Sequence, residues 1–361
     1  MDKICSKCVM DTTDKEIVFD ERGICNHCHQ FEVKKENLRP YSELLRIFNK
    51  IKMENIKKEF DCVIGISGGV DSSYVTYQAF KHGLRAMLIH CDNGQNAPEA
   101  DENIKSMAKY TQFPLITVTL DEQEFKEIIK AYLRAGVPDL EVATDHSITA
   151  SVCIQAIKTK TKYLLSGSNI ASEGVMPETW AYLKQDSTNI KDIYEKFGNG
   201  KRLEHFPFFS YYSRKWHEDV VKDLRIIKIL NYISYDKEKA KKELIADCGW
   251  KDYGGKHCES VWTRFFQDYI LPVRFNIDTR KAYYSALINM GQMDRDEALK
   301  RLSKPAYTPS QMKKDKAKVL SWLEMDEDEF DSLMRQPKRM HIDFKNNQNV
   351  AKLYMKVKKL I

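Results

Sequence analysis

Seven consecutive residues in the first quarter of the chain have the composition of a phosphate-binding loop. They are Ser67, Gly68, Gly69, Val70, Asp71, Ser72 and Ser73. Two glycines let the backbone turn sharply and approach a phosphate without a Cβ in the way, and the N–H groups at a helix N-terminus attract anions. The serines add hydroxyl donors, whereas a bare phosphate would repel Asp71. Asp71 therefore indicates a Mg²⁺ bridge or an N-terminal cap, and the alternative for the whole segment is an ordinary tight turn.

The elements that must position this loop are a buried strand before it and a helix after it. Residues 61–66 are mostly apolar, as in a strand of a parallel sheet that is covered on both faces, and residues 73–82 are predicted to be helical. The pattern continues with strands at 86–90, 115–119 and 163–166 and helices at 99–111, 122–135 and 147–160. This alternation predicts an α/β fold, an open parallel sheet with helices on both faces. Such sheets bind ligands at the carboxyl ends of their strands.

A second chemical pattern lies at the N-terminus, where Cys5 and Cys8 form one Cys-x2-Cys pair and Cys25 and Cys28 form another, with 16 residues between the two pairs. Four thiolates in this spacing predict a closed, tetrahedral and therefore structural Zn²⁺ site; a [4Fe–4S] cluster is the alternative. A module of about 30 residues buries too little core to fold alone, so the metal would supply its folding energy. The flanking histidines, His27 and His29, are interpreted as exposed or supporting groups and not as ligands.

Composition restricts the class of protein. The 361 residues carry 58 Lys+Arg and 52 Asp+Glu, a net charge of +6 that suits an anionic small molecule such as a nucleotide. Nucleic-acid binders usually show a stronger basic excess, so nucleic acid is not expected as a partner. No run approaches the ~20 apolar residues of a membrane span, and the N-terminus lacks a signal-type apolar stretch. A cytoplasmic protein without membrane insertion is expected. Because that compartment is reducing, its nine cysteines favour metal binding or burial over disulfides.

The phosphate loop, residues 67–73, resembles the signature of the PP-loop ATP pyrophosphatases and lacks the Gly-Lys-Ser/Thr of a Walker A loop. The resemblance implies that ATP is cleaved between its α and β phosphates, that AMP passes to a substrate oxygen, and that pyrophosphate is released. It also implies roles for two later segments. His90 and Asp92, after the second strand, match the place where such enzymes hold adenosine. Gly167 and Asn169, after the fourth strand, match their second glycine turn near the α-phosphate.

Two further segments resemble the N-acetyl sugar amidotransferases of surface-polysaccharide and nonulosonic-acid pathways. They are the cysteine module, which reads CSKCVMDT at 5–12 and GICNHC at 23–28, and the stretch that reads YGGKHCES at 253–260 and TRFFQ at 263–267. The likeness continues with Leu-Pro at 271–272, Ile-Asp at 277–278 and Arg-Lys at 280–281, and it extends from the N-terminus to about residue 305.

This resemblance implies that an N-acetyl sugar is converted to an acetamidino sugar, with ATP, Mg²⁺ and ammonia. It also implies separate glutaminase and cyclase-like subunits that deliver the ammonia, similar to the two parts of imidazole glycerol phosphate synthase. Asp71, Lys256 and Arg264 would then act on the phosphates or the sugar, with His257 and Glu259 beside them. The alternative is that Glu259 and Arg264 form surface ion pairs and that Lys256 is solvated.

Three regions are predicted: a zinc module at 1–35, a PP-loop ATP-binding domain at 36–205, and a mainly helical extension at 206–361 that contributes to the substrate site and to partner contacts. The chief alternative function is that of a tRNA thiolation enzyme of the same superfamily. Those enzymes often need catalytic cysteines in the core, whereas here Cys153 stands alone, with Cys248 and Cys258 far away in sequence. A non-enzymatic scaffold is a second alternative, against which the intact phosphate loop argues.

Overall fold

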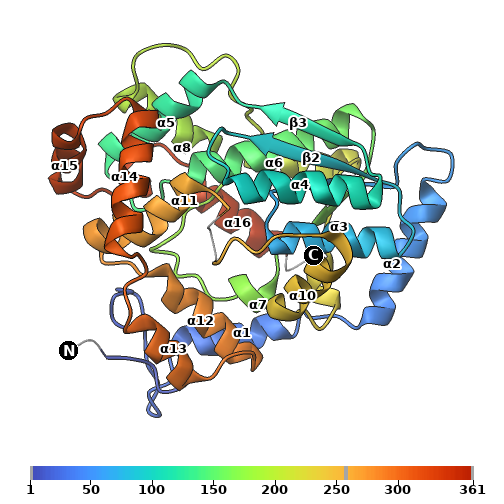
Figure 1. Cartoon of the computed structure of the whole chain (residues 1–361), viewed down its shortest axis with the longest axis horizontal. Helices are drawn as coiled ribbons and strands as arrows, with labels where there is room; N and C mark the ends of the chain where they lie inside the picture. The colour runs from blue at the N-terminus through green and yellow to red at the C-terminus, as the bar shows by residue number, and fades with distance from the viewer. Residues whose placement is uncertain (1–2, 256–258, 359–361) are drawn as a thin grey trace.

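The computed structural model describes residues 3–255 and 259–358. The described residues include a five-stranded parallel sheet with helices packed around it (Figure 1). The strand order is β3-β2-β1-β4-β5. The strands are β1 Cys62–Gly65, β2 Ala86–Asp92, β3 Leu115–Thr119, β4 Tyr163–Ser166 and β5 Arg225–Lys228. The chain winds outward from β1 to β3 and then returns to the other side of β1 at β4. The resulting switch point between β1 and β4 is where open α/β sheets bind ligands.

Helices cover both faces of this sheet, as predicted, because successive strand residues point to opposite sides. Ile64 and Leu88 pack into a core shared with α2 and α3, whereas Val63 and Met87 face the core shared with α6. The helices that precede β5 are α1 Asn26–Lys35, α2 Tyr41–Glu54, α3 Val70–Lys81, α4 Pro98–Thr111, α5 Glu122–Ala135, α6 Val142–Lys158, α7 Ile170–Glu173, α8 Ser187–Phe197, α9 Tyr211–Lys215 and the π-helical η1 Trp216–Val221.

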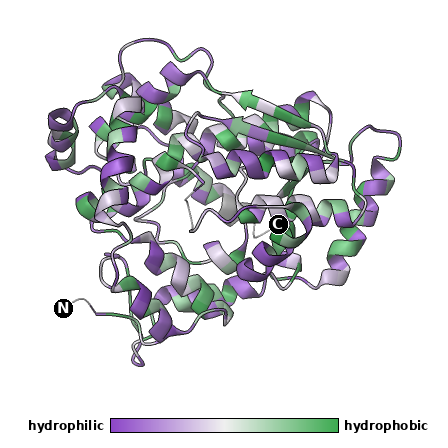
Figure 2. Ribbon diagram, viewed as in Figure 1, coloured by the Kyte–Doolittle hydropathy of each residue, from purple (hydrophilic) through white to green (hydrophobic). Residues whose placement is uncertain are grey.

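The part of the chain after β5 is helical, as predicted. Its elements are η2 Ile229–Tyr232, α10 Lys237–Cys248, α11 Val261–Phe265, η3 Phe266–Phe275, α12 Thr279–Met290, α13 Arg295–Leu302, α14 Pro309–Leu323, α15 Glu327–Arg335, η4 His341–Asp343 and α16 Gln348–Lys358. Hydrophilic and hydrophobic residues alternate along the outer helices (Figure 2), as expected of helices with one face toward a core. Trp262, Phe265 and Phe266 are buried in that core. Within the described residues no helix has both the length and the apolar character needed to cross a bilayer.

Three local predictions differ from the structure. The strand β5 was not predicted, because its only apolar pair, Ile226 and Ile227, lies between charged residues at the edge of the sheet. The predicted domain boundary at 205 therefore leaves out the fifth strand. The helix α1 was not predicted, because it buries only His27, Cys28 and Phe31, too few for a clear period. The helix α6 begins at Val142 instead of 147, and in its first turns Asp145 pairs with Lys184 and His146 accepts from the N–H of Phe209.

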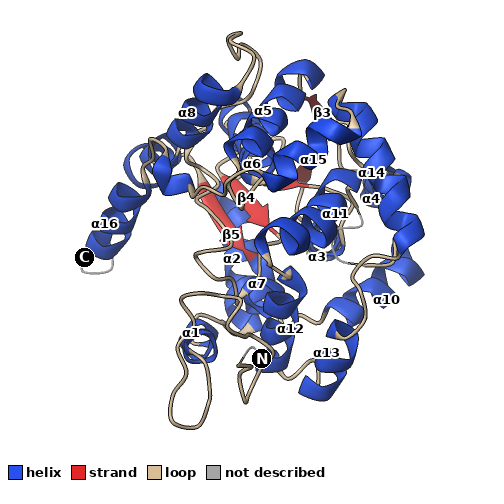
Figure 3. Ribbon diagram, turned by 90° about the vertical axis from the view of Figure 1, so that its left-hand side faces the viewer, coloured by secondary structure: helices blue, strands red, loops and turns tan. Residues whose placement is uncertain are grey.

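The N-terminal module lies at one end of the molecule, beside α12 and α13 of the C-terminal part (Figures 1 and 3). Arg295 donates to the backbone carbonyls of Cys5 and Cys8. On the other side of α1, Lys34 donates to the carbonyl of Gly174 at 2.6 Å, and Phe31 packs against the same residue. The module is therefore fixed both to the C-terminal helices and to α7, the short helix that follows β4.

Two buried histidines are expected to make the fold sensitive to acid. Burial lowers the pKa of His146 and of His341 from 6.5 to about 4. His146 accepts a hydrogen bond from the N–H of Phe209 through Nε2, an acceptor that protonation would remove. Because the unfolded chain binds protons at these imidazoles between pH 6.5 and 4 while the folded chain does not, stability falls as the pH falls through that window. The loss should reach about 3 kcal/mol for each histidine.

Urea unfolding at pH 7 and pH 5 tests this expectation. The variant His341→Asn should be less stable than the parent at pH 7 but should lose less stability on acidification. The exposed His205 supplies the control, since His205→Gln should leave the pH dependence unchanged. Equal pH dependence in all three proteins would contradict the assignment.

Candidate functional site

The phosphate loop connects β1 to α3, and Gly68 is its tightest point. Gly68 has φ +76°, and a Cβ there would lie 2.3 Å from the carbonyl oxygen of Ala100 in α4. Its own carbonyl accepts from Trp250 Nε1 at 3.0 Å and from Asn103 Nδ2 at 3.3 Å. The loop thus needs glycine for its conformation and for the space, and two side chains from outside hold it in place.

The N-terminus of α3 points its first N–H groups at this loop. Gly69 caps the helix without a side-chain hydrogen bond, so Asp71 lies in the first turn and is not the cap. Ser67 and Ser72 share a hydroxyl contact of 3.2 Å at the half-buried mouth of the loop. Ser73 is fully buried, and its Oγ has no hydrogen-bond partner among the described residues. The N–H groups of the first turn and the half-buried hydroxyls of Ser67 and Ser72 form a set of donors for an anion.

The Asp71 carboxylate meets three side chains from the opposite side of the site. Tyr235 donates its hydroxyl to Oδ1, Asn169 Nδ2 lies 3.5 Å from the same oxygen, and Lys237 Nζ lies 3.9 Å from Oδ2. Burial and the Asp71 charge together raise the pKa of Tyr235 well above its usual range. Asp71 is thus engaged on both oxygens, and it lies in the first turn of α3 and does not cap the helix.

Sequence reasoning missed Tyr235 and Lys237. Both follow β5, the strand that was not predicted, at the start of α10. The available signal was Asp236, which caps α10 by accepting from the N–H of Lys239 at 3.0 Å and precedes a Lys/Glu-rich helical segment.

The second glycine turn lies against the first. A Cβ on Gly167 would lie 3.1 Å from the carbonyl carbon of Asp71 and 3.2 Å from the N atom of Ser72. Asn169 then caps α7 by accepting from the N–H of Ser172 at 2.8 Å. The turns after β1 and β4 are therefore in contact.

His90 and Asp92 end the neighbouring strand β2, at the same edge of the sheet. His90 Nδ1 contacts the carbonyl of Ile66 at 3.0 Å, and its Nε2 contacts Asn96 Nδ2 at 3.0 Å. Asp92 accepts from the N–H of Gly94 at 2.9 Å. Both side chains thus order the backbone beside the phosphate loop.

The C-terminal part returns to this edge through a short antiparallel contact. The N–H of Ala97 donates to the carbonyl of Glu259 at 2.8 Å, and the N–H of Val261 donates to the carbonyl of Gln95 at 3.0 Å. This contact places Glu259 beside the loop, with its Oε1 3.9 Å from the position of a Cβ on Gly69. Tyr253 also reaches the loop, since its hydroxyl accepts from the N–H of Val70 at 3.3 Å.

The other predicted residues of this segment are placed differently. Arg264 Nε pairs with Asp315 of α14 at 2.7 Å, and Tyr307 donates to the same carboxylate at 2.6 Å. Asp315 is almost completely buried. Lys256 and His257 lie outside the described residues.

Four sulfur atoms form a second site in the N-terminal module. The Sγ atoms of Cys5, Cys8, Cys25 and Cys28 all lie within 4.8 Å of one another, and the four residues are buried. Backbone N–H groups point at Sγ of Cys5, and Asn289 Nδ2 lies 3.5 Å from Sγ of Cys28, as expected around thiolates that bind a metal. The donor set fits a closed metal site.

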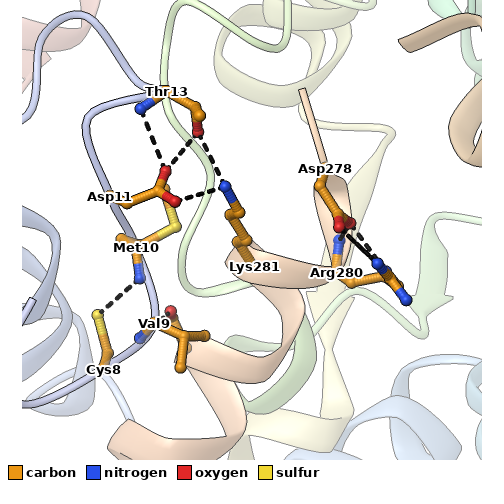
Figure 4. Close-up of polar contacts among 9 residues, drawn as sticks. Cys8, Val9, Met10, Asp11, Thr13, Asp278, Arg280 and Lys281 are labelled. Atoms are coloured by element: carbon orange, nitrogen blue, oxygen red, sulfur yellow. Dashed lines mark hydrogen bonds and ion pairs between the residues drawn. The ribbon is translucent and has the colours of Figure 1, made fainter. Parts of the chain in front are cut away.

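Polar contacts fix this module to α12 (Figure 4). Lys281 of α12 donates to the carboxylate of Asp11, which also accepts from Thr13. The residue before Lys281, Arg280, pairs with Asp278 at the start of the same helix. The histidines behave as interpreted from the sequence: His27 is buried against Asp14 at 2.6 Å, and His29 is exposed.

Two family models match separate parts of this chain, and both matched parts contribute to the site around the phosphate loop. The family model "Asparagine synthase" matches residues 56–169, and the model "LPS biosynthesis protein WbpG-like, C-terminal domain" matches residues 259–358. The first match contains the phosphate loop and the second glycine turn, and the second begins at Glu259. No curated protein matches the chain.

Two solved structures show remote likeness. One is a predicted subunit of tRNA methyltransferase from Methanocaldococcus jannaschii, with 17% identity over 50% of this chain and 74% of that chain and a TM-score of 0.29. The other is the U34-tRNA thiolase NcsA from Methanococcus maripaludis with its [4Fe-4S] cluster, with 12% identity over 81% of this chain and 88% of that chain and a TM-score of 0.35. Neither value is high enough to support a functional argument.

Proposed function

We propose that this chain, which is an N-acetyl sugar amidotransferase of the PP-loop ATP pyrophosphatase superfamily, adenylates the acetamido oxygen of its sugar and replaces that oxygen with ammonia. Its two matched domains make it an ATP-dependent amidotransferase of lipopolysaccharide biosynthesis. The observation that supports the finer reaction is the meeting of the two domains. Glu259, the first residue of the WbpG-like domain, borders Gly69 of the phosphate loop.

The chemistry explains why ATP is needed. An amide oxygen is a very poor leaving group, so it first attacks the α-phosphate of ATP and becomes part of an AMP ester, with release of pyrophosphate. The N–H groups at the start of α3 and the hydroxyls of Ser67 and Ser72 bind the phosphates, and Lys237 faces their charge. Asp71 is the residue that would hold Mg²⁺, which would neutralise negative charge that develops on the phosphates. Ammonia then attacks the activated carbon, and AMP leaves.

Ammonia is proposed to come from separate glutaminase and cyclase-like subunits. Burial raises the pKa of Cys153 and of Cys248 to about 12, and it also raises the pKa of Cys62 and Cys91. Thiols of this kind are inert. Among the described residues, these four therefore offer no nucleophile for glutamine hydrolysis or for sulfur transfer, which also disfavours tRNA thiolation. For the four-cysteine site we propose structural Zn²⁺, since four thiolates leave no position open for catalysis.

Lys237 supplies a direct test of the phosphate-binding side. The variant Lys237→Met should lower ATP–pyrophosphate exchange about 100-fold, because it removes the charge that faces the developing pyrophosphate. Lys241 is a matched control on the same helix: its side chain is 14% exposed against 13% for Lys237, but it pairs with Asp252 at 3.2 Å. Lys241→Met should keep exchange within a few fold. Equal losses in both variants would indicate a structural role for the helix and no special role for Lys237.

The reaction itself is tested by mass spectrometry. Nucleotide-linked N-acetyl sugars are incubated with the chain, MgATP and an ammonium salt, and omission of ATP is the control. We expect a product in which one oxygen has become NH, together with AMP and pyrophosphate. No change on any sugar, but thiolation of tRNA in the presence of a sulfur donor, would overturn the proposal.

A further inference from the structure

One buried carboxyl at the ligand-binding edge takes no part in the site described above. Glu141 is 6% exposed and directly precedes α6. Its Oε2 accepts a hydrogen bond from Thr263 Oγ1 at 2.9 Å, whereas its Oε1 is buried without a hydrogen-bond partner. A buried, unpartnered carboxylate oxygen costs free energy, so its presence needs an explanation.

The position of Glu141 follows from the path of α6. Ser147 and Ser151 of this helix lie against Cys91, the second-last residue of β2, at 3.9 and 3.6 Å. Glu141 precedes Ser147 by six residues. At a rise of about 1.5 Å per residue it lies about 9 Å further out, beyond the carboxyl ends of the strands. Its partner Thr263 is four residues after Glu259, which borders the phosphate loop. The free oxygen therefore lies where the two domains meet.

The charges around Glu141 leave it without a cation of its own. Lys184 Nζ lies 2.8 Å from Asp139 and 3.0 Å from Asp145, so two carboxylates already neutralise it. On the other side, α11 contributes the uncharged Thr263, and the next residue, Arg264, pairs with Asp315. Burial and the nearby Asp145 charge raise the pKa of Glu141 from 4.5 to about 8. A carboxyl of this kind exchanges protons near neutral pH, as an acid–base group must.

The proposed reaction needs such a group. Ammonia carries three protons. After its nitrogen has attacked the adenylated carbon, it must lose one of them so that the intermediate can expel AMP. Resting on the proposed function, we infer that Glu141 takes this proton. The C–N bond forms at the adenylated acetamido carbon, the C–O bond to AMP breaks with its electron pair on the phosphate oxygen, and one proton passes from nitrogen to Oε1 of Glu141.

The test separates the two half-reactions. Glu141→Gln keeps the side-chain volume and an acceptor for Thr263 but cannot accept the proton. Sugar-dependent ATP–pyrophosphate exchange, which reports adenylation, should stay within about threefold of the parent. Formation of the amidine from ammonium salt should fall at least about 100-fold, as for loss of a general base. Equal losses in both assays, or no loss in either, would overturn the role of Glu141.

A second variant tests the role without removing the carboxyl. Asp145→Asn removes the neighbouring charge that helps to raise the pKa of Glu141, so the rise of amidine formation with pH should move to lower pH. An unmoved profile would count against Glu141 as the base. If the parent protein itself shows no sugar-dependent exchange with any N-acetyl sugar, the proposed function and this inference both fail. A parent with exchange and a Glu141→Gln variant that still makes amidine overturns the inference alone.

Discussion

Alanine in place of Gly68 is expected to lower ATP-dependent adenylation at least about 100-fold, the loss typical of removing preorganised phosphate and oxyanion donors. The physical reason is steric. The added Cβ would lie 2.3 Å from the carbonyl oxygen of Ala100, and the φ of +76° is one that alanine rarely adopts. Ala100 cannot move aside freely, because its helix begins at the contact between Ala97 and Glu259. The loop must therefore change shape, and its N–H groups lose their common direction.

Gly83 provides the matched control for this variant. It also has a positive φ, +65°, but no atom lies within 4 Å of the position of its Cβ. Gly83→Ala should cost about 1 kcal/mol of stability through backbone strain alone and should leave adenylation unchanged. Pyrophosphate exchange, calorimetric binding of a non-hydrolysable ATP analogue and thermal unfolding distinguish the two variants. A Gly68→Ala protein that is folded and binds the analogue normally would show that this loop does not hold the phosphates.

Loss of the metal site is expected to have the second large effect. Cys28→Ser, or treatment with a strong chelator, should remove the bound metal and destabilise the fold by more than about 4 kcal/mol, the range reached when a structural metal is lost. The effect should reach the phosphate site. The module holds α7 through Phe31 and Lys34, and α7 directly follows Asn169, which contacts Asp71. Adenylation should therefore fall together with metal content.

Metal analysis, thermal unfolding and pyrophosphate exchange on the same samples check this prediction. Cys248→Ala is the control, because Cys248 is buried at the end of α10 and lies outside the four-sulfur cluster. It should retain the metal and most of the activity. A metal-free protein with unchanged unfolding temperature and exchange would contradict a structural role for the module.

The sequence by itself determined the parts of this protein that have a local signature. The glycines of residues 67–73 stand between an apolar strand and a helix, and phosphate binding needs this order within a single turn of chain. The four cysteines were equally clear, because a tetrahedral thiolate site needs two short Cys-x2-Cys pairs whatever surrounds them. The strands β1, β2 and β4 were found for the same reason, since a strand buried on both faces is a continuous apolar run.

Only the tertiary structure decided which side chains share the site with this loop. Tyr235 is 164 positions from Asp71, and Thr263 is 122 positions from Glu141. Such contacts arise when strands and helices pack, and no local pattern encodes them. The edge strand β5 was not predicted, because it is short and flanked by charged residues. Lys237, which follows this strand in the chain, was therefore not predicted as a site residue either. The sequence predicted that Arg264 acts on the phosphates or the sugar, whereas the structure pairs it with Asp315, from a helix that the sequence did not connect to it. Pattern thus identified the chemistry of the phosphate loop, whereas packing selected the residues that surround it.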